Sequence, residues 1–239
     1  MTTPTADEPQ PAAVPYGTPD APRIAVRGEA HLEVDPEFAR IGITVSARGR
    51  DRRAALDDLT RRNTTALDLV KSYGDAVERV ETGAFSITPE LTKHGRGERI
   101  RTYQGAVRIT AELTDFTALG ELTTRLADLD LTHIDGPWWA LRPDSPAHRE
   151  ARRKAVHEAV QRAREYADAL GTTLAALVEL ADIGADAPQP YSATPGRMRS
   201  VAYGGAAEDS AAAPLDLEPQ RQHVYASVNA RFTMTPPAL

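Results

Sequence analysis

The chain has 239 residues, 41% hydrophobic and 26% charged, which is an ordinary composition for a globular protein with a sizeable core. Its 28 basic and 34 acidic residues give a net charge of -6, so the charge balance offers no general attraction to nucleic acid or anionic lipid. The chain contains no cysteine, which excludes disulfides, thiolate nucleophiles and Cys-ligated zinc.

The N-terminal residues 1–22 are rich in proline and carry only acidic charges, at Asp7, Glu8 and Asp20. They have neither a basic segment nor an apolar segment typical of a secretion signal, so we interpret them as a disordered tail. We therefore expect a cytoplasmic protein, unless the start codon was assigned downstream of a true signal. No apolar run approaches the roughly 18 residues of a membrane-spanning helix, so no membrane span is expected.

Apolar and polar residues alternate with a period of two over 24–34 and again over 39–45, which predicts two half-buried strands. The intervening Asp35-Pro36-Glu37 is a turn signal, so we expect a β-hairpin. A helical stripe of apolar residues follows from Asp51, the expected N-cap, and stops before Gly74.

The rest of the chain continues this mixture of strands and helices. We expect strands at 77–88, 100–113, 131–141, 174–183 and 224–234, a helix from Asp115, and a long helix opened by Ser145-Pro146. The first two of these strands are expected to form a hairpin. The inward stripe of the long helix consists mostly of alanine, at Ala151, Ala155, Ala159, Ala163 and Ala167.

The order ββαββαβαββ predicts an α+β fold, with mainly antiparallel sheet or sheets and amphipathic helices packed on them. Residues 185–220 are rich in Ala, Pro and Gly and are expected to form a flexible loop. Because the strand at 224–234 follows this loop, we expect one domain over residues 23–235 that the loop interrupts.

Five segments in this order resemble the SIMPL-domain family, a bacterial group with some animal members. They are VRGEAHLEVDPEFARIGITV, VETGAFSITPEL, TYQGAVRITAEL with DFTALGEL, HREARRKAVHEAVQRAREYADALG and VYASVNARFTM. The chain departs from the family at Pro36-Glu37, where relatives usually have Pro-Asp, and at Thr102-Tyr103-Gln104-Gly105, where they have Gly-Tyr-x-Ala. The resemblance implies no established catalytic activity, a tendency of some bacterial relatives to form large oligomers, a signalling-adaptor role in animals, and export of many relatives.

No catalytic motif is complete. His157-Glu158 begins an H-E-x-x-H zinc motif, but Gln161 occupies the second histidine position. His31 and His223 face outward on strands that could be neighbours, and Glu29 or Glu33 could supply a further metal ligand, yet solvent-exposed histidines explain the same pattern. We therefore expect no catalytic, cofactor-binding or metal-binding residue.

Arginine clusters at 48–62 and 149–154 are interleaved with acidic residues, which favours solvated helix faces over a nucleic-acid site.

Trp138, Trp139 and Tyr225 are the candidate interface residues. Adjacent strand residues face opposite ways, so one tryptophan is expected in the core and the other outside, where it contacts a partner or is covered by the loop or tail. Tyr225 points outward on the last strand.

Our leading hypothesis is a non-enzymatic protein that forms a homo-oligomer or binds a protein partner. The alternatives are a cryptic hydrolase or metal-dependent enzyme that uses His and carboxylate groups, and a small-molecule carrier.

Overall fold

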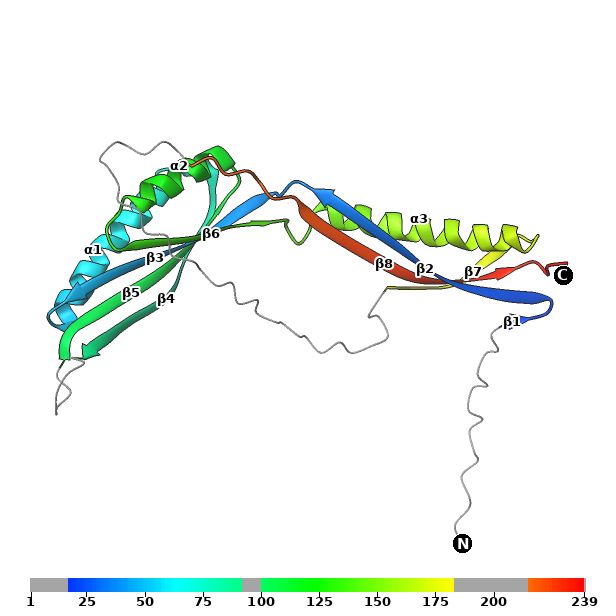
Figure 1. Cartoon of the computed structure of the whole chain (residues 1–239), viewed down its shortest axis with the longest axis horizontal. Coiled ribbons are helices and arrows are strands. Elements are labelled where there is room, and N and C mark those ends of the chain that lie inside the picture. Colours follow the sequence, from blue (N-terminus) through cyan, green and yellow to red (C-terminus); the bar gives the residue numbers. More distant parts are fainter. Residues whose placement is uncertain (1–16, 92–99, 183–214, 239) are drawn as a thin grey trace, which may run out of the picture. The chain divides into compact units, whose positions relative to one another are not determined.

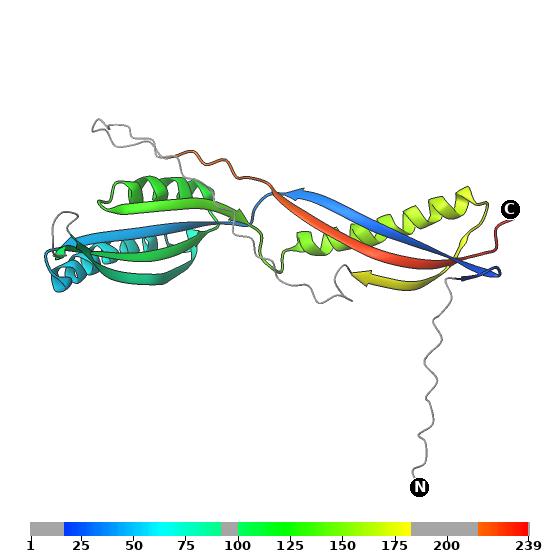
Figure 2. The ribbon, with the colours of Figure 1, turned by 60° about the horizontal axis from the view of Figure 1, so that its bottom comes forward.

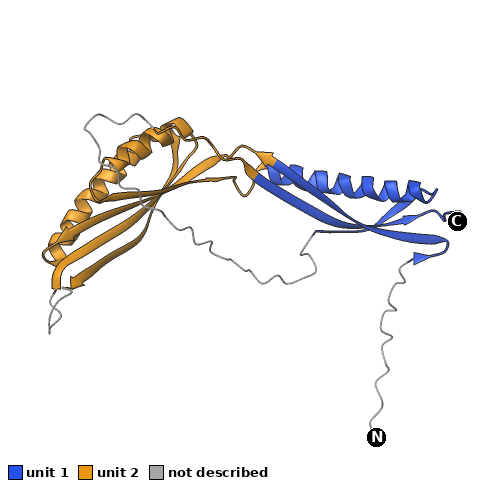
Figure 3. Ribbon diagram, viewed as in Figure 1, with its two compact units in different colours: residues 1–32, 146–197, 223–239 blue, residues 33–145, 198–222 orange. Residues whose placement is uncertain are grey.

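The computed structural model of the chain describes residues 17–91, 100–182 and 215–238 (Figure 1). Where the sequence suggested a single domain over 23–235, the contacts divide the chain into two compact units (Figure 3). Unit 1 comprises residues 1–32, 146–197 and 223–239, and unit 2 comprises residues 33–145 and 198–222. Each unit has its own sheet and its own buried apolar cluster.

Two expected irregular segments are described only in part. Of the expected tail at 1–22, residues 17–22 contain a short strand and the start of a long one, and residues 1–16 lie outside the described part of the chain. Of the expected loop at 185–220, only residues 215–220 are described.

Unit 1 is a four-stranded sheet with one long helix along one face (Figure 2). The strand order is β1 (Gly17–Thr18), β2 (Ala21–Val34), β8 (Gln222–Met234) and β7 (Leu174–Asp182), and the helix is α3 (Pro146–Ala169). The five alanines of the predicted inward stripe are all fully buried, which confirms that face of α3. Three of them, Ala155, Ala159 and Ala163, pack with Val26, Ala30, Val228 and Phe232 of the sheet.

The helix lies very close to the sheet at Gly28. A Cβ atom on Gly28 would lie 2.1 Å from the carbonyl oxygen of Ala155 and 2.5 Å from the backbone nitrogen of Ala159. Only a residue without a side chain fits between these backbones, so glycine on β2 and alanine on α3 together permit the close packing.

Unit 2 is a four-stranded antiparallel sheet with two helices. The strand order is β4 (Val77–Leu91), β5 (Ile100–Leu113), β3 (Phe38–Gly49) and β6 (Thr132–Ala140), and the helices are α1 (Arg52–Lys71) and α2 (Phe116–Ala127), with a short 3-10 turn at Gly74–Ala76. Asp51 caps α1 as predicted, since its carboxylate accepts a hydrogen bond from the Ala54 amide at 2.8 Å.

Both helices of unit 2 cover the same face of the sheet. The fully buried Ile41, Ile43 and Ile109 of the sheet form one cluster with Leu122 of α2 and Val70 of α1. The other face of this sheet, which carries the alternate residues of each strand, is left without a helix among the described residues.

The predicted hairpin of the first two long strands is wrong. β2 lies between β1 and β8, whereas β3 lies between β5 and β6 in the other sheet. Alternation specifies a strand and its buried face, but the pairing depends on residues far along the chain. The second predicted hairpin is confirmed, because β4 and β5 pair antiparallel.

Candidate interaction surfaces

The face of unit 2's sheet opposite its helices carries polar and charged side chains and one exposed tryptophan. Arg40 of β3 and Glu112 of β5 are cross-strand partners and form an ion pair of 2.6 Å between Nη2 and Oε1. Trp138 of β6 lies opposite Arg40 in the sheet register and is 46% exposed. A large apolar ring therefore stands among charged groups on an open sheet face.

The surroundings of Trp138 are fixed by three strands. A Cβ atom on Gly42 would lie 2.7 Å from Nη2 of Arg108 and 3.4 Å from Cη2 of Trp138, so both side chains extend over this glycine. Asp135 lies beside two basic side chains. Its Oδ2 is 3.7 Å from Nη2 of Arg108, and its Oδ1 is 3.1 Å from Nε2 of His133. We call Gly42, Arg108, His133, Asp135 and Trp138 the Trp138 surface. Alternation indicated the outward residues, but only the register places β5 and β6 on either side of Gly42.

Trp139 points to the opposite face of the same strand. Its ring meets Phe116 of α2 edge to face, with ring centroids 4.8 Å apart and an interplanar angle of 82°. It packs against the buried cluster of unit 2. The two adjacent tryptophans thus divide as expected for neighbouring strand residues, with Trp139 toward the core and Trp138 outward.

Tyr225 lies on the sheet of unit 1 and is 50% exposed. Its hydroxyl accepts a hydrogen bond from Nη2 of Arg27 at 2.7 Å and donates one to Oε1 of Glu29 at 3.1 Å. Arg27 and Glu29 also form an ion pair of 2.8 Å, and the ring of His31 lies 4.8 Å from the Tyr225 ring. These four residues form the Tyr225 surface, in which a rigid aromatic ring is held by charged neighbours from β2.

The residues considered for metal binding do not assemble a site. Within residues 17–91, 100–182 and 215–238, no group of three or more His, Cys, Asp or Glu side chains could hold a metal ion. His31 packs on Tyr225, and the amide of Gln161 donates a hydrogen bond to Glu165 at 3.0 Å. His94 lies outside the described residues.

Among the residues that the structure describes, two carboxyls have a lowered pKa, and ion pairs account for both. The hydrogen bond from Arg62 and the nearby charges of Arg62 and Arg61 outweigh a slight burial and lower the pKa of Asp58. Lys154 lowers the pKa of Glu150 in the same way, through a hydrogen bond and its positive charge. The residues of each pair lie one helical turn apart, on α1 and on α3 respectively, as is usual for ion pairs on an exposed helix face.

Of the helices that the structure describes, none combines the length and the apolar composition that crossing a bilayer requires.

Comparison with known proteins now decides the family. Residues 24–232 match the model of the SIMPL family, which is described as a protein of unknown function (DUF541). The chain belongs to the SIMPL family. The resemblance seen in the sequence is therefore confirmed, and the family description names no reaction, cofactor or substrate.

The names of two relatives of this SIMPL protein state a cellular compartment. The 26 kDa periplasmic immunogenic proteins of Brucella melitensis and Brucella abortus are each 25% identical over 186 residues, covering 75% of this chain and 73% of the relative. The uncharacterized protein YggE of Edwardsiella ictaluri is 20% identical over 157 residues, covering 65% of this chain and 66% of the relative. The Brucella names contradict our expectation of a cytoplasmic protein, which rested only on the composition of the N-terminal residues.

Proposed function

We propose that this SIMPL protein is a non-enzymatic scaffold that associates with copies of itself, or with a protein partner, through the Trp138 surface. One observation carries the proposal: Trp138 is exposed on a sheet face that no helix covers among the described residues. Tryptophan and arginine are enriched at the centres of protein interfaces, where a large ring excludes water and a guanidinium makes several hydrogen bonds. Trp138 and Arg108 provide both.

The Tyr225 surface supports the same proposal as a second contact area. A tyrosine held by Arg27 and Glu29 loses little side-chain freedom on binding, so less of the binding energy is spent on ordering it. Its ring and charged neighbours match the composition of polar interface rims.

We further propose that this association takes place in the periplasm, supported by the names of the two Brucella relatives. Fractionation of the bacterium that expresses the untagged chain tests this part. Recovery of the protein with periplasmic markers is the expected result, and recovery with cytoplasmic markers contradicts it.

Solution mass tests the association. Light scattering coupled to size exclusion is measured for the full chain, for Trp138→Ala and for Tyr166→Ala, a control at a 56% exposed aromatic residue on α3. We expect a discrete oligomer that Trp138→Ala weakens and Tyr166→Ala preserves. An oligomer that both variants preserve contradicts the role of Trp138. A monomeric full chain contradicts self-association. The partner is then a different protein, to be sought with the same pair of variants.

A further inference from the structure

One side of β2 is an open strand edge in unit 1. β2 pairs with β8 on its other side, and on the open side β1 accompanies it only at Ala21 and Pro22. From Arg23 to Val34, no strand of the described residues lies along that side. Backbone amides and carbonyls at such an edge can pair with a strand of another molecule.

Two side chains of α3 bind the backbone at this edge. Oε2 of Glu158 accepts a hydrogen bond from the amide of Glu29 at 3.1 Å, and Nη1 of Arg162 donates one to the carbonyl oxygen of Arg27 at 2.8 Å. Glu158 and Arg162 lie one helical turn apart and form an ion pair through Oε1 and Nη2. We call this pair of side chains the edge clasp. It makes hydrogen bonds that an added strand would otherwise make with β2.

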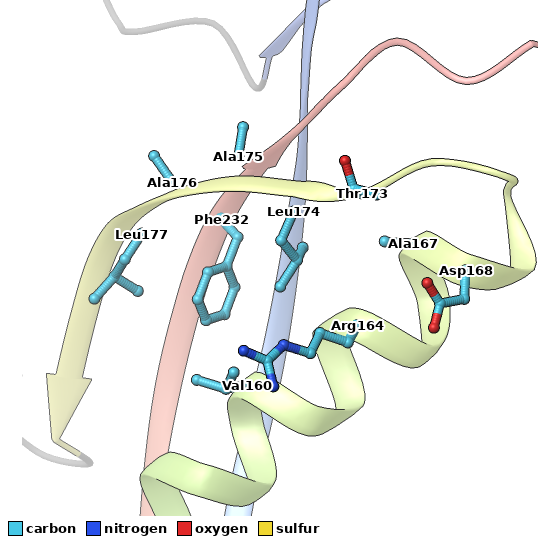
Figure 4. A pocket seen from close by; sticks show the side chains of 10 residues that line it. All are labelled: Val160, Arg164, Ala167, Asp168, Thr173, Leu174, Ala175, Ala176, Leu177 and Phe232. Atoms are coloured by element: carbon cyan, nitrogen blue, oxygen red, sulfur yellow. The ribbon is translucent and has the colours of Figure 1, made fainter.

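The close packing of α3 at Gly28 brings the edge clasp within reach of the backbone. Gly28 lies at the centre of the clasped segment, and a Cβ atom on it would meet the helix backbone at Ala155 and Ala159. On the opposite flank of α3, Arg164 and Val160 line a groove of about 430 Å³ beside β7 (Figure 4). The helix is therefore bonded to the edge of β2 and leaves a groove at the other side of the sheet.

The sequence of β2 is complementary to itself when a second β2 runs antiparallel to it about Gly28. Opposite charges then face each other on one side of the sheet, and apolar residues face each other on the other side. The opposed residues are Arg23 and Glu33, Ile24 and Leu32, Val26 and Ala30, and Arg27 and Glu29. Directly opposed charges of unlike sign and directly opposed apolar residues stabilise an antiparallel pair. The strand that fits this edge is therefore β2 of a second copy of the chain.

The edge clasp occupies the centre of that register. Two opposed residues whose backbone groups face each other exchange both an N–H and a C=O hydrogen bond. Arg27 and Glu29 of the second strand form such a pair, because the Arg27 carbonyl and the Glu29 amide point to the open edge. Both groups are already bonded to the edge clasp, so it has to open before two β2 strands can pair.

Two fully folded copies cannot pair in this register. Paired strands lie about 4.8 Å apart, whereas packed helices need about 8–10 Å between their axes. Since α3 lies directly against Gly28, the two helices would overlap. The second strand must therefore come from a copy whose α3 is not yet docked on its sheet.

We propose that the edge clasp excludes β2 of a partly folded second copy from the open edge of β2, and so prevents strand addition between copies. This assigns a role to Glu158, which the sequence places in an incomplete zinc motif. The inference goes beyond the proposed scaffold role and does not use the Trp138 surface.

A terminally blocked peptide of residues 23–33 represents β2 of the partly folded copy. N-methylation at its positions 24, 26, 30 and 32 prevents fibre growth through its outer edge. Fluorescence anisotropy measures its binding to the full chain, to the Glu158→Ala/Arg162→Ala variant and to a Glu150→Ala/Lys154→Ala control. Glu150 and Lys154 form an ion pair of 3.0 Å with the same spacing on α3, and among the described residues they make no hydrogen bond to β2.

The variant without the edge clasp is expected to bind the peptide about tenfold more tightly than the full chain, and the control variant should match the full chain. A peptide with Arg27→Glu and Glu29→Arg places like charges opposite each other and should bind weakly. A peptide N-methylated at positions 27 and 29 should not bind, because it lacks the amides that face β2.

Hydrogen exchange at the Glu29 amide, followed by NMR, tests the edge clasp without a peptide. Glu158→Ala should accelerate this exchange about tenfold, whereas Glu158→Gln, whose side chain still offers an acceptor oxygen, should retain most of the protection. Circular dichroism establishes that each variant is folded. If the double variant does not fold, Arg162→Ala alone replaces it in the binding experiment.

Three outcomes would overturn the proposal. They are a peptide that does not bind the variant without the edge clasp, a peptide that binds all three chains equally, and unchanged exchange at Glu29 in Glu158→Ala. Trp138→Ala should leave both measurements unchanged, so failure of the scaffold proposal and failure of this one are distinguishable.

Discussion

Gly28 of β2 lies directly against Ala159 of α3, where a Cβ atom on the glycine would stand 2.7 Å from the Cβ of the alanine. The carbonyl oxygen of Ala155 would be closer still, at 2.1 Å. The close position of the helix on the sheet of unit 1 depends on this contact.

Gly28→Ala is expected to lower the free energy of unfolding by about 3 kcal/mol, because the added methyl group meets the helix backbone, which has no rotamer to change. Urea unfolding followed by circular dichroism measures the loss. Gly83→Ala on β4 is the control, since a Cβ there would find its nearest neighbour at 3.7 Å. Adding Ala159→Gly should not restore stability, because the Ala155 carbonyl remains; full recovery in the double variant would contradict this account.

Gly42→Ala presents a similar overlap with a different expected outcome. The atom in the way is Nη2 of Arg108, the far end of a flexible side chain, so it can move aside. We expect the free energy of unfolding to change by less than about 1 kcal/mol, while the fluorescence of Trp138 shifts because the guanidinium beside Gly42 moves. Trp139→Phe removes the second tryptophan so that the signal reports on Trp138. A stability loss as large as that of Gly28→Ala would show that the Trp138 surface is rigid.

The two tryptophans should respond differently to truncation. Trp139→Ala removes the ring that packs on Phe116 and is expected to cost about 2 kcal/mol of unfolding free energy, somewhat less than a fully buried tryptophan. Trp138→Ala should change stability by less than about 0.5 kcal/mol, because Trp138 lies on the open face of the sheet and is 46% exposed. Thermal and urea unfolding of both variants measure these values. Equal losses would place Trp138 in the folded core and remove it as an interface residue.

The ion pair of Asp58 with Arg62 should make stability depend on pH. The pKa of Asp58 is lower in the folded chain than its ordinary value of 3.8, so the pair stabilises the fold above that pH and loses its contribution as pH falls through the lowered pKa. Asp58→Asn is expected to cost about 0.5 kcal/mol at neutral pH, and the cost should shrink below about pH 4. Asp57→Asn, at an exposed neighbouring position, is the control. A cost for Asp58→Asn that stays constant down to pH 2 would argue against the ion pair.

Much of unit 1 and unit 2 was predictable from local sequence patterns. Alternation located the long strands, Asp51 marked the start of α1, and the alanine stripe identified the buried face of α3. The opposite orientations of Trp138 and Trp139 followed from the pleat of a strand. These features depend on residues close together in the chain, so the sequence carries them directly.

The sequence by itself determined the kinds of element, their order, their buried faces and the family. The tertiary structure alone decided that β2 pairs with β8 rather than β3, that Arg108 and Trp138 meet over Gly42, and that Arg164 faces a groove beside β7. The physical reason is that strand pairing and helix placement are set by contacts between distant residues, which hydrophobic periodicity does not encode.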